Sequence, residues 1–197
     1  MSGVGSNLVE IKIAGRGGQG VVLASRIISA ALLEAGSWVQ SFPSFGAERR
    51  GAPVAAFVRA AEEEITLRCA VKNPDWLLIL DPALAANPMA LAGVTSSTSI
   101  LANSPRPLAP LAPSRSSKTR PGRVFLVDAF SIAAGLGLVS GSMPMVNTAL
   151  VGAFAQASGL LGRELMGRTV ARLSPVKKAD NRAAAEKAFE AVREIKP

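Results

Sequence analysis

A glycine-rich turn between a strand-like run and a helix-like run most narrows the folds open to this chain. The stretch IKIAGRGGQGVVLASRIISA covers residues 11–30, and four glycines fall within six of its positions. Glycine adopts backbone angles that other residues avoid and lets another group approach the backbone closely. Gly15, Gly17 and Gly20 match the spacing G-x-G-x-x-G. Between a strand and a helix, that spacing is typical of a site for a phosphate-bearing ligand at a helix N-terminus.

Two ligand classes fit this turn poorly. A dinucleotide-binding unit has an Asp or Glu about 20 residues beyond the glycines to hold the ribose hydroxyls, and no carboxylate stands between Glu34 and Glu48. A P-loop needs G-K-S/T after the glycines, which is absent. A phosphate-bearing ligand other than NAD is favoured, and a turn that only packs the helix on the sheet is the alternative. The residues expected to contact such a ligand are Gly15, Arg16, Gly17, Gly18, Gln19 and Gly20.

Alternating strand-like and helix-like runs predict an α/β fold. Strands are expected over 8–15, 38–42, 76–81 and 123–129, and within 95–104. Helices are expected over 21–36, 83–93, 147–161 and 179–195. The runs 54–60 and 64–70 are typical of a hairpin. We therefore predict a single domain over 1–197: a three-layer α/β sandwich with a Rossmann-like glycine-rich β-loop-α unit and a mixed sheet including one hairpin. A Pro/Ser-rich loop over 105–122 and a C-terminal helix over 179–197 complete it.

The residue counts remove several kinds of chemistry. The chain has one cysteine, Cys69, and no histidine. By itself it cannot form a disulfide, a Cys/His zinc site, a Cys-ligated iron–sulfur cluster or a Ser-His-Asp or Cys-His catalytic group. Cys69 follows a strand-like run, which favours a buried thiol over a reactive one. If the chain serves an enzyme, most of the covalent chemistry takes place elsewhere.

The net charge of +8 is weak evidence for nucleic-acid binding, because the basic residues are spread along the chain and only 5% of residues are aromatic. The N-terminus has no basic segment followed by an apolar one, and no apolar run approaches membrane-spanning length. We therefore expect a soluble, cytoplasmic protein that binds neither nucleic acid nor membrane.

A second loop carries an unusual concentration of charge. The stretch SFPSFGAERRGAP covers 41–53 and includes Ser44, Glu48, Arg49 and Arg50. An arginine pair suits phosphate or carboxylate recognition, and Glu48 can hold one guanidinium in place. The alternative is a loop that packs against another subunit, with its arginines in structural ion pairs.

Four sequence blocks together resemble one family. They are GRGGQGVV, FPSFGAERRGAPVAAFVR, NPDWLLILDPAL and VNTALVGAFAQASGL, in this order across almost the whole chain. The combination resembles the gamma subunit of the CoA-acylating 2-oxoacid:ferredoxin oxidoreductases, of which pyruvate synthase is the best-known member. The match weakens only over 85–122. Indolepyruvate oxidoreductases have a similar glycine turn but usually a different second loop, and are the near alternative.

The resemblance implies a hetero-oligomer that oxidatively decarboxylates a 2-oxoacid to an acyl-CoA. Thiamine diphosphate with Mg would lie in alpha and beta subunits and the iron–sulfur clusters mainly in a delta subunit, with ferredoxin or an NAD-linked acceptor taking the electrons. The gamma chain would be a non-catalytic scaffold that helps to bind coenzyme A.

The resemblance also implies roles for particular residues. The turn from Gly15 to Gly20 would lie near the CoA pyrophosphate. Residues facing the same ligand or a partner chain would be Ser44, Glu48, Arg49 and Arg50. Asn147 and Thr148 begin the expected helix and would either lie near the site or cap that helix.

Two further classes stay open: a stand-alone dinucleotide-binding oxidoreductase, and a structural subunit whose loops contact only protein. The sequence does not name the 2-oxoacid, the electron acceptor or the subunit stoichiometry.

Overall fold

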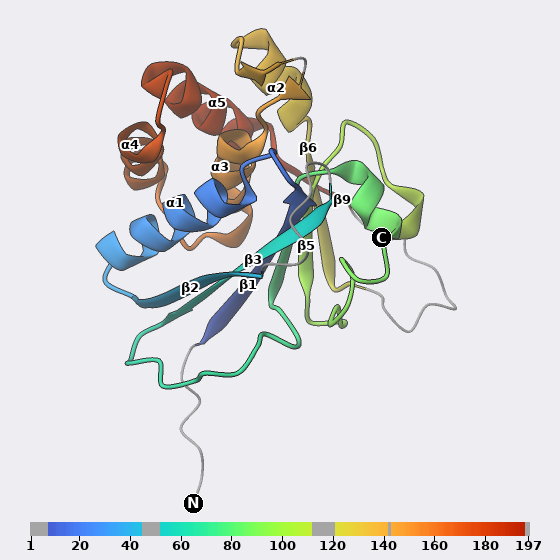
Figure 1. The fold of residues 1–197 in the computed structure, drawn as a ribbon, viewed down its shortest axis with the longest axis vertical. Coiled ribbons are helices and arrows are strands. Elements are labelled where there is room, and N and C mark those ends of the chain that lie inside the picture. The colour runs from blue at the N-terminus through green and yellow to red at the C-terminus, as the bar shows by residue number, and fades with distance from the viewer. Residues whose placement is uncertain (1–7, 45–51, 112–120, 142, 196–197) are drawn as a thin grey trace, which may run out of the picture.

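The computed structural model describes residues 8–44, 52–111, 121–141 and 143–195 (Figure 1). Within it, strands predominate up to residue 127, with one α-helix and two 3-10 helices among them, and α-helices predominate after it. Their bounds, with η for 3-10 helices, are β1 (Val9–Arg16), α1 (Val21–Glu34), β2 (Trp38–Ser44), β3 (Pro53–Ala61), β4 (Trp76–Ile79), η1 (Pro82–Ala86), β5 (Ser99–Asn103), η2 (Ala109–Leu111), β6 (Arg123–Val127), α2 (Ala129–Gly135), β7 (Val139–Ser140), β8 (Met143–Pro144), α3 (Asn147–Ser158), α4 (Arg163–Leu173), α5 (Lys178–Ala191) and β9 (Arg193–Ile195).

A mixed sheet of seven strands forms the centre of the described fold, in the order β2-β3-β1-β4-β5-β6-β9. β1, β4, β5 and β6 run parallel, so their carboxyl ends meet at one edge of the sheet. β3 is antiparallel to both β1 and β2, and β9 is antiparallel to β6. The expected mixed sheet is confirmed, and its hairpin consists of β2 and β3. A second, two-stranded sheet pairs β7 with β8.

The expected hairpin between 54–60 and 64–70 is wrong. β3 is paired with β2 along one edge and with β1 along the other. No edge of β3 is therefore left for the strand-like run 64–70. That run instead has no regular structure in the stretch between β3 and β4.

The expected Rossmann-like unit is not confirmed. In a Rossmann fold the first two strands of the unit are neighbours in the sheet. Here β3 lies between β1 and β2. β2 still runs parallel to β1, because each is antiparallel to β3. The glycine-rich turn lies between a strand and a helix as predicted, but in a different strand arrangement.

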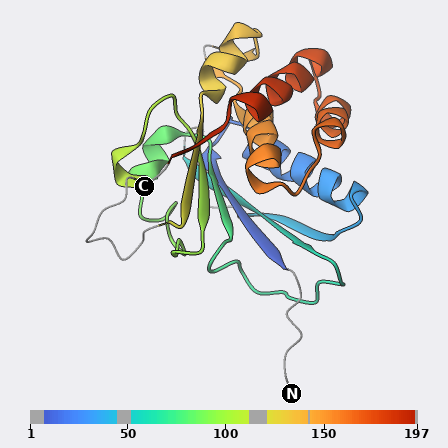
Figure 2. The same ribbon diagram turned by 180° about the vertical axis from the view of Figure 1, so that it is seen from behind.

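The α-helices gather on one face of the sheet (Figures 1 and 2). Their core includes Ile13, Ile28, Leu78, Leu150 and Phe154. On the opposite face, a smaller cluster joins sheet residues to η1 and to irregular chain before β5. The third layer of the expected sandwich is therefore made of short 3-10 and irregular segments rather than α-helices. No helix in the described ranges combines the length and apolarity needed to cross a lipid bilayer.

The C-terminal region differs from the prediction in two respects. Helix α4 was not expected from the sequence; its mean hydropathy is low and it packs only a narrow stripe, including Met166 and Val170, on its neighbours. The helix expected over 179–195 ends at Ala191, and Arg193–Ile195 pairs with β6 instead. This pairing satisfies backbone groups along an otherwise free edge of β6.

Candidate functional site

The glycine-rich turn is closed by hydrogen bonds between its two ends. The backbone N–H of Gln19 donates to the carbonyl of Arg16 at 3.0 Å. The side-chain Oε1 of Gln19 in turn accepts from the backbone N–H of Arg16 at 2.8 Å. Gly15 has no room for a side chain, since a Cβ there would press against Val21 and Leu80. The turn is thus a fixed element that joins the end of β1 to the start of α1.

The N-termini of α1 and α3 meet at this turn. Gly20, which precedes α1, has a φ of 79° and lies against the side chain of Asn147, the first residue of α3. Neither helix has a side-chain cap at this end among the described residues. Asn147 is 1% exposed, and its Nδ2 has no hydrogen-bond partner in the described ranges. Uncapped N–H groups and the positive ends of two helix dipoles favour an anion here.

Thr148 lies outside this site. Its Oγ1 donates to Oδ1 of Asn181 in α5 at 2.9 Å, and the residue is fully buried. Successive helix residues point about 100° apart, so Asn147 faces the turn while Thr148 faces the helix layer. The structure separates the two residues that the sequence placed together.

The second charged loop begins and ends beside the glycine turn. It starts after Ser44, the last residue of β2, and it ends at Pro53, which is in register with Arg16. The N–H of Gly17 donates to the carbonyl of Ala52 at 3.0 Å. Glu48, Arg49 and Arg50 lie outside the described residues. Both ends of their loop are nevertheless at the sheet edge that carries the glycine turn.

Three polar residues that the sequence analysis did not select also lie at this edge. Asp81 follows β4, Asn103 ends β5 and Asp128 follows β6. A signal for them exists, because each comes at the end of an apolar strand and parallel strands align these ends. They line a cleft of about 380 Å³, whose walls include Gln19, Leu80, Pro82, Pro105, Phe130, Ser131, Met143, Pro144 and Val146.

Most polar atoms of these three residues have structural partners. Oδ2 of Asp81 lies 2.6 Å from Nε of Arg16, and its Oδ1 accepts from the N–H of Ala83. Asn103 donates to the carbonyl of Leu80, and Asp128 caps α2. The edge therefore offers a rigid frame around the turn.

The described residues do not include a group of three or more His, Cys, Asp or Glu side chains arranged for a metal ion. Cys69 is exposed, so the expectation that it is buried is wrong. It lies in the irregular segment between β3 and β4, far along the chain from the glycine turn. The part of the sheet edge that suits an anion is the junction of the uncapped N-termini of α1 and α3.

A family model described as pyruvate ferredoxin/flavodoxin oxidoreductase matches residues 10–191. The chain belongs to this family. The resemblance seen in the four sequence blocks is thereby confirmed.

Several relatives match most of the chain. The common gamma subunit of the pyruvate/ketoisovalerate oxidoreductases from Thermococcus kodakarensis is 36% identical over 183 residues, which is 92% of this chain and 96% of the relative. The PorC subunit of pyruvate synthase from Methanocaldococcus jannaschii is 34% identical, covering 83% of this chain and 84% of its own. The gamma subunit of an NADH-dependent phenylglyoxylate dehydrogenase from Aromatoleum evansii is 36% identical, covering 83% and 82%.

Solved structures agree with this assignment. Pyruvate oxidoreductase subunit PORC from Thermotoga maritima matches with a TM-score of 0.78 and 29% identity, covering 96% of this chain and 99% of that one. The fold also matches part of a 2-oxoglutarate:ferredoxin oxidoreductase from Magnetococcus marinus with coenzyme A bound, at a TM-score of 0.65 and 21% identity, over 93% of this chain and 30% of that one. This chain is accordingly a gamma-type subunit of a 2-oxoacid:ferredoxin oxidoreductase of the pyruvate synthase kind.

Proposed function

We propose that this gamma-type subunit helps to bind coenzyme A at the sheet edge formed by the glycine-rich turn, the ends of the second loop and the N-terminus of α3. Its partners would be thiamine diphosphate-binding alpha and beta subunits and an iron–sulfur delta subunit. The complex would oxidatively decarboxylate a 2-oxoacid and transfer the acyl group to coenzyme A. This chain would supply binding and scaffolding rather than reacting groups.

The observation that carries the proposal is the meeting of two uncapped helix N-termini at Gly20 and Asn147. A pyrophosphate needs several N–H donors and a positive potential, and this junction supplies both. Arg16, at the end of β1, can add a charge-assisted contact. Arg49 and Arg50 belong to the loop whose two ends are anchored beside the turn, and we expect their guanidinium groups to bind the remaining phosphate charge.

Thiamine diphosphate and the clusters would be held by the partner subunits. This chain has one cysteine and no histidine, so by itself it cannot ligate an iron–sulfur cluster. The residues do fit coenzyme A. The glycines of the turn leave the backbone open to a phosphate group, and the acidic residue that would bind the ribose of a dinucleotide is absent. When bound, coenzyme A supplies the thiol that accepts the acyl group. The residues of this chain would hold its phosphates and so fix where the thiol can reach.

The separation of β1 from β2 argues against a stand-alone dinucleotide-binding oxidoreductase. In a dinucleotide fold, the acidic residue that binds the ribose stands at the end of the strand next to the glycine turn. The neighbour of β1 on that side is β3, which runs in the opposite direction. Its residue beside the turn is Pro53.

The test is the dependence of the assembled enzyme on coenzyme A. The tagged chain is purified anoxically with its partners, and dye reduction is measured with a panel of 2-oxoacids. Arg16→Ala and Arg49→Ala should each raise the KM for coenzyme A by about tenfold, the loss expected for one charge-assisted contact, with kcat little changed. Lys187→Ala, an exposed residue of α5, is the control and should leave the KM unchanged.

An unchanged KM in both arginine variants would overturn the proposal in favour of a structural subunit. A chain recovered without thiamine- and iron-bearing partners, but with bound NAD or NADP, would instead support the dinucleotide class.

A further inference from the structure

A second pocket lies at the other end of the sheet from the glycine turn. In the β1–β3 pairing, Glu10 is in register with Arg59, and Arg16 is in register with Pro53. Glu10 and Arg16 are six residues apart along β1, which corresponds to roughly 20 Å at about 3.3 Å per residue. The pocket has a volume of about 380 Å³ and is lined by Gln40, Phe42, Arg59, Leu67, Arg68, Cys69 and Ala70. It is therefore distinct from the proposed coenzyme A site.

The pocket is built by pinning irregular chain across the face of the sheet opposite the α-helices. Nε2 of Gln40 donates to the carbonyl of Ile65 at 2.8 Å. Nη2 of Arg59 donates to the carbonyl of Cys69 at 2.7 Å. These two hydrogen bonds hold the segment between β3 and β4 against β2 and β3. The ring of Phe42 from β2 stacks on the ring of Phe57 from β3. The walls are thus fixed by side chains of β2 and β3.

Arg59 is a buried cation with donors to spare. It is 1% exposed, and its guanidinium carbon lies 5.5 Å from the centre of the Phe42 ring. Nε pairs with Oε1 of Glu10 at 2.8 Å, and Nη2 is used by Cys69. Nη1 donates to no described residue, and it is not among the fully buried atoms that lack a partner, so it keeps contact with solvent. Because Arg59 lines the pocket, an acceptor placed there would complete it.

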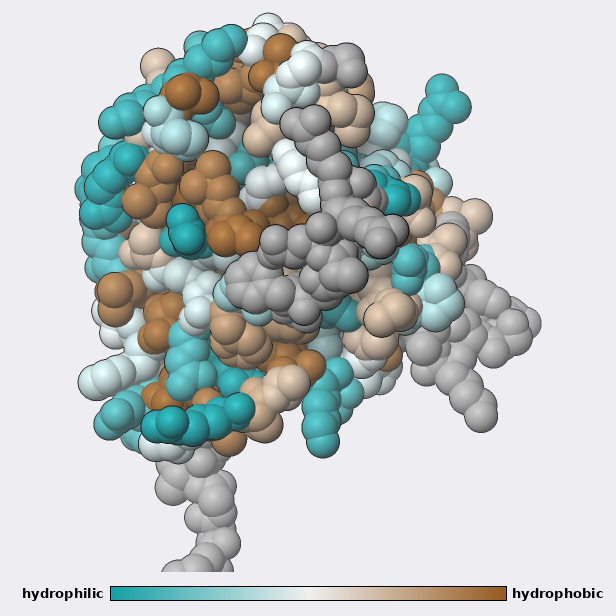
Figure 3. Space-filling model, in the orientation of Figure 1, coloured by the Kyte–Doolittle hydropathy of each residue, from teal (hydrophilic) through white to brown (hydrophobic). Residues whose placement is uncertain are grey.

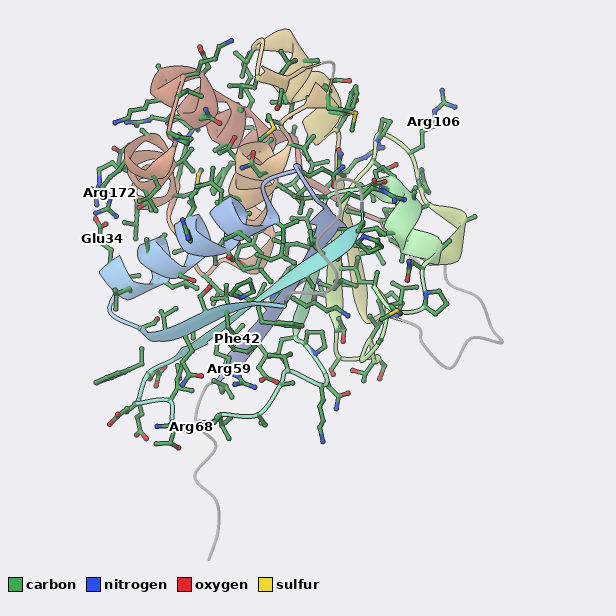
Figure 4. The ribbon with its side chains drawn as sticks, viewed as in Figure 1. Glu34, Phe42, Arg59, Arg68, Arg106 and Arg172 are labelled. Atoms are coloured by element: carbon green, nitrogen blue, oxygen red, sulfur yellow. The ribbon has the colours of Figure 1, made fainter. Side chains whose placement is uncertain are left out.

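The rim of the pocket adds a second cation. Arg68 is exposed and forms no ion pair with any described residue. Glu10 offsets the charge of Arg59, so Arg68 leaves the pocket with a net positive charge. Beside it, Leu67 is 44% exposed. Figure 4 shows Phe42, Arg59 and Arg68 near one another, at the end of the sheet where β1 begins. Two guanidinium groups next to an apolar wall suit a carboxylate on a short aliphatic stem.

We propose that this pocket receives an Asp or Glu side chain of a partner subunit. The chain is a gamma-type subunit, so part of its surface must contact other chains, and arginine and aromatic residues are enriched in such contacts. Its net charge of +8 calls for acidic partners. The inference does not depend on the coenzyme A proposal, because the pocket lies at the opposite end of the sheet.

Cys69 is a built-in reporter for this contact. It is exposed, it lines the pocket, and it is the only cysteine in the sequence. The full-length chain and its assembled complex are each treated with N-ethylmaleimide, and the labelled Cys69 peptide is quantified by mass spectrometry. We expect Cys69 to react in the free chain and to react at least about tenfold more slowly in the complex. Equal rates in the two would overturn the proposal.

Variants at the rim test the charge itself. Arg68→Glu should release the partner subunits at a lower salt concentration than the wild type and restore labelling of Cys69, whereas Arg68→Lys should lie between the two. Lys72→Glu is the matched control, because Lys72 is exposed, lies outside the pocket and undergoes the same change of charge. It should behave as the wild type.

One further outcome would reject the carboxylate contact. It is a complex of Arg68→Glu that keeps both its salt resistance and the protection of Cys69, because the pocket would then be covered without recognition of charge. The coenzyme A proposal has a separate readout, the KM for coenzyme A, so either proposal can fail alone.

Discussion

Nε of Arg16 lies 2.6 Å from Oδ2 of Asp81, and this contact joins the ends of two parallel strands at the edge that carries the glycine turn. Arg16 ends β1, and Asp81 follows β4 and also caps η1 through its Oδ1. One carboxylate therefore fixes both the arginine beside the turn and the chain that leaves the neighbouring strand. Because Arg16 is 39% exposed, solvent weakens the ionic part of this contact.

Two substitutions separate the roles of Asp81. Asp81→Asn keeps an N-cap oxygen and removes the charge, so it should lower the free energy of unfolding by only about 0.5 kcal/mol. Asp81→Ala removes both roles and should cost about 1.5 kcal/mol. Urea denaturation of the full-length chain measures the difference. Equal losses would mean that the cap contributes nothing.

Gly20 should tolerate alanine worse than Gly36, another glycine with positive φ. At Gly36, φ is 97° and a Cβ would meet open space, so Gly36→Ala should cost about 1 kcal/mol from backbone strain alone. At Gly20 the new methyl group would also press on Asn147, and we expect a loss of about 2 kcal/mol or more. Adding Asn147→Ala to Gly20→Ala should recover part of it. Additive losses in the double variant would contradict this contact.

Thr148→Val should affect stability without affecting ligand binding. The change removes a buried hydrogen bond between α3 and α5 and leaves Oδ1 of Asn181 unpaired, at a cost of about 2 kcal/mol. In the assembled enzyme, the KM for coenzyme A should stay at its wild-type value. A raised KM with unchanged stability would place Thr148 in the site after all.

Lys12 should make stability depend on pH in the alkaline range. Its Nζ donates to the carbonyls of Met89 and Ala92, and burial lowers the pKa of Lys12 below its ordinary value of 10.5. Between the folded-state pKa and 10.5 the unfolded chain binds more protons, so the contribution of Lys12 to the free energy of unfolding rises with pH across that window. Below the folded-state pKa this contribution is at its lowest.

Denaturation of the wild type and of Lys12→Met from neutral pH to about pH 10 tests this direction. The difference in unfolding free energy should shift in favour of the wild type as pH rises. The same comparison for Lys72→Met, at an exposed position, provides the baseline. If the difference for Lys12→Met changed with pH no more than the difference for Lys72→Met, the burial of the Lys12 charge would be contradicted.

The face formed by the helices carries an apolar area with a polar rim. In Figure 3, hydrophobic residues gather on part of this face, and hydrophilic residues line its rim.

An ion-pair group joins α1 to α4 on this surface. Glu34 of α1 forms ion pairs with Arg168 and Arg172 of α4, and the hydrogen bond from Arg168 is the main reason that the pKa of Glu34 is lowered. Figure 4 shows Glu34 next to Arg172. Long-range ion pairs of this kind leave no local sequence pattern.

Local patterns were enough to locate the glycine turn and α1, since close glycines followed by an apolar stripe have few other interpretations. They also placed most strands, and the four ordered blocks correctly indicated the family. The wrong hairpin has a clear physical cause. The run 64–70 has the composition of a strand, but strand composition does not show whether an edge is free to pair.

The sequence by itself determined which segments favour turns, strands and helices, because backbone freedom and apolar period are local properties. Only the tertiary structure decided which residues meet. It directed Asn147 to the turn and Thr148 to α5, aligned Asp81 with Arg16, and buried Arg59 under a segment that had looked like a strand. The physical reason is competition: each strand has two edges and each helix a limited surface to bury, and the whole chain decides which segments occupy them.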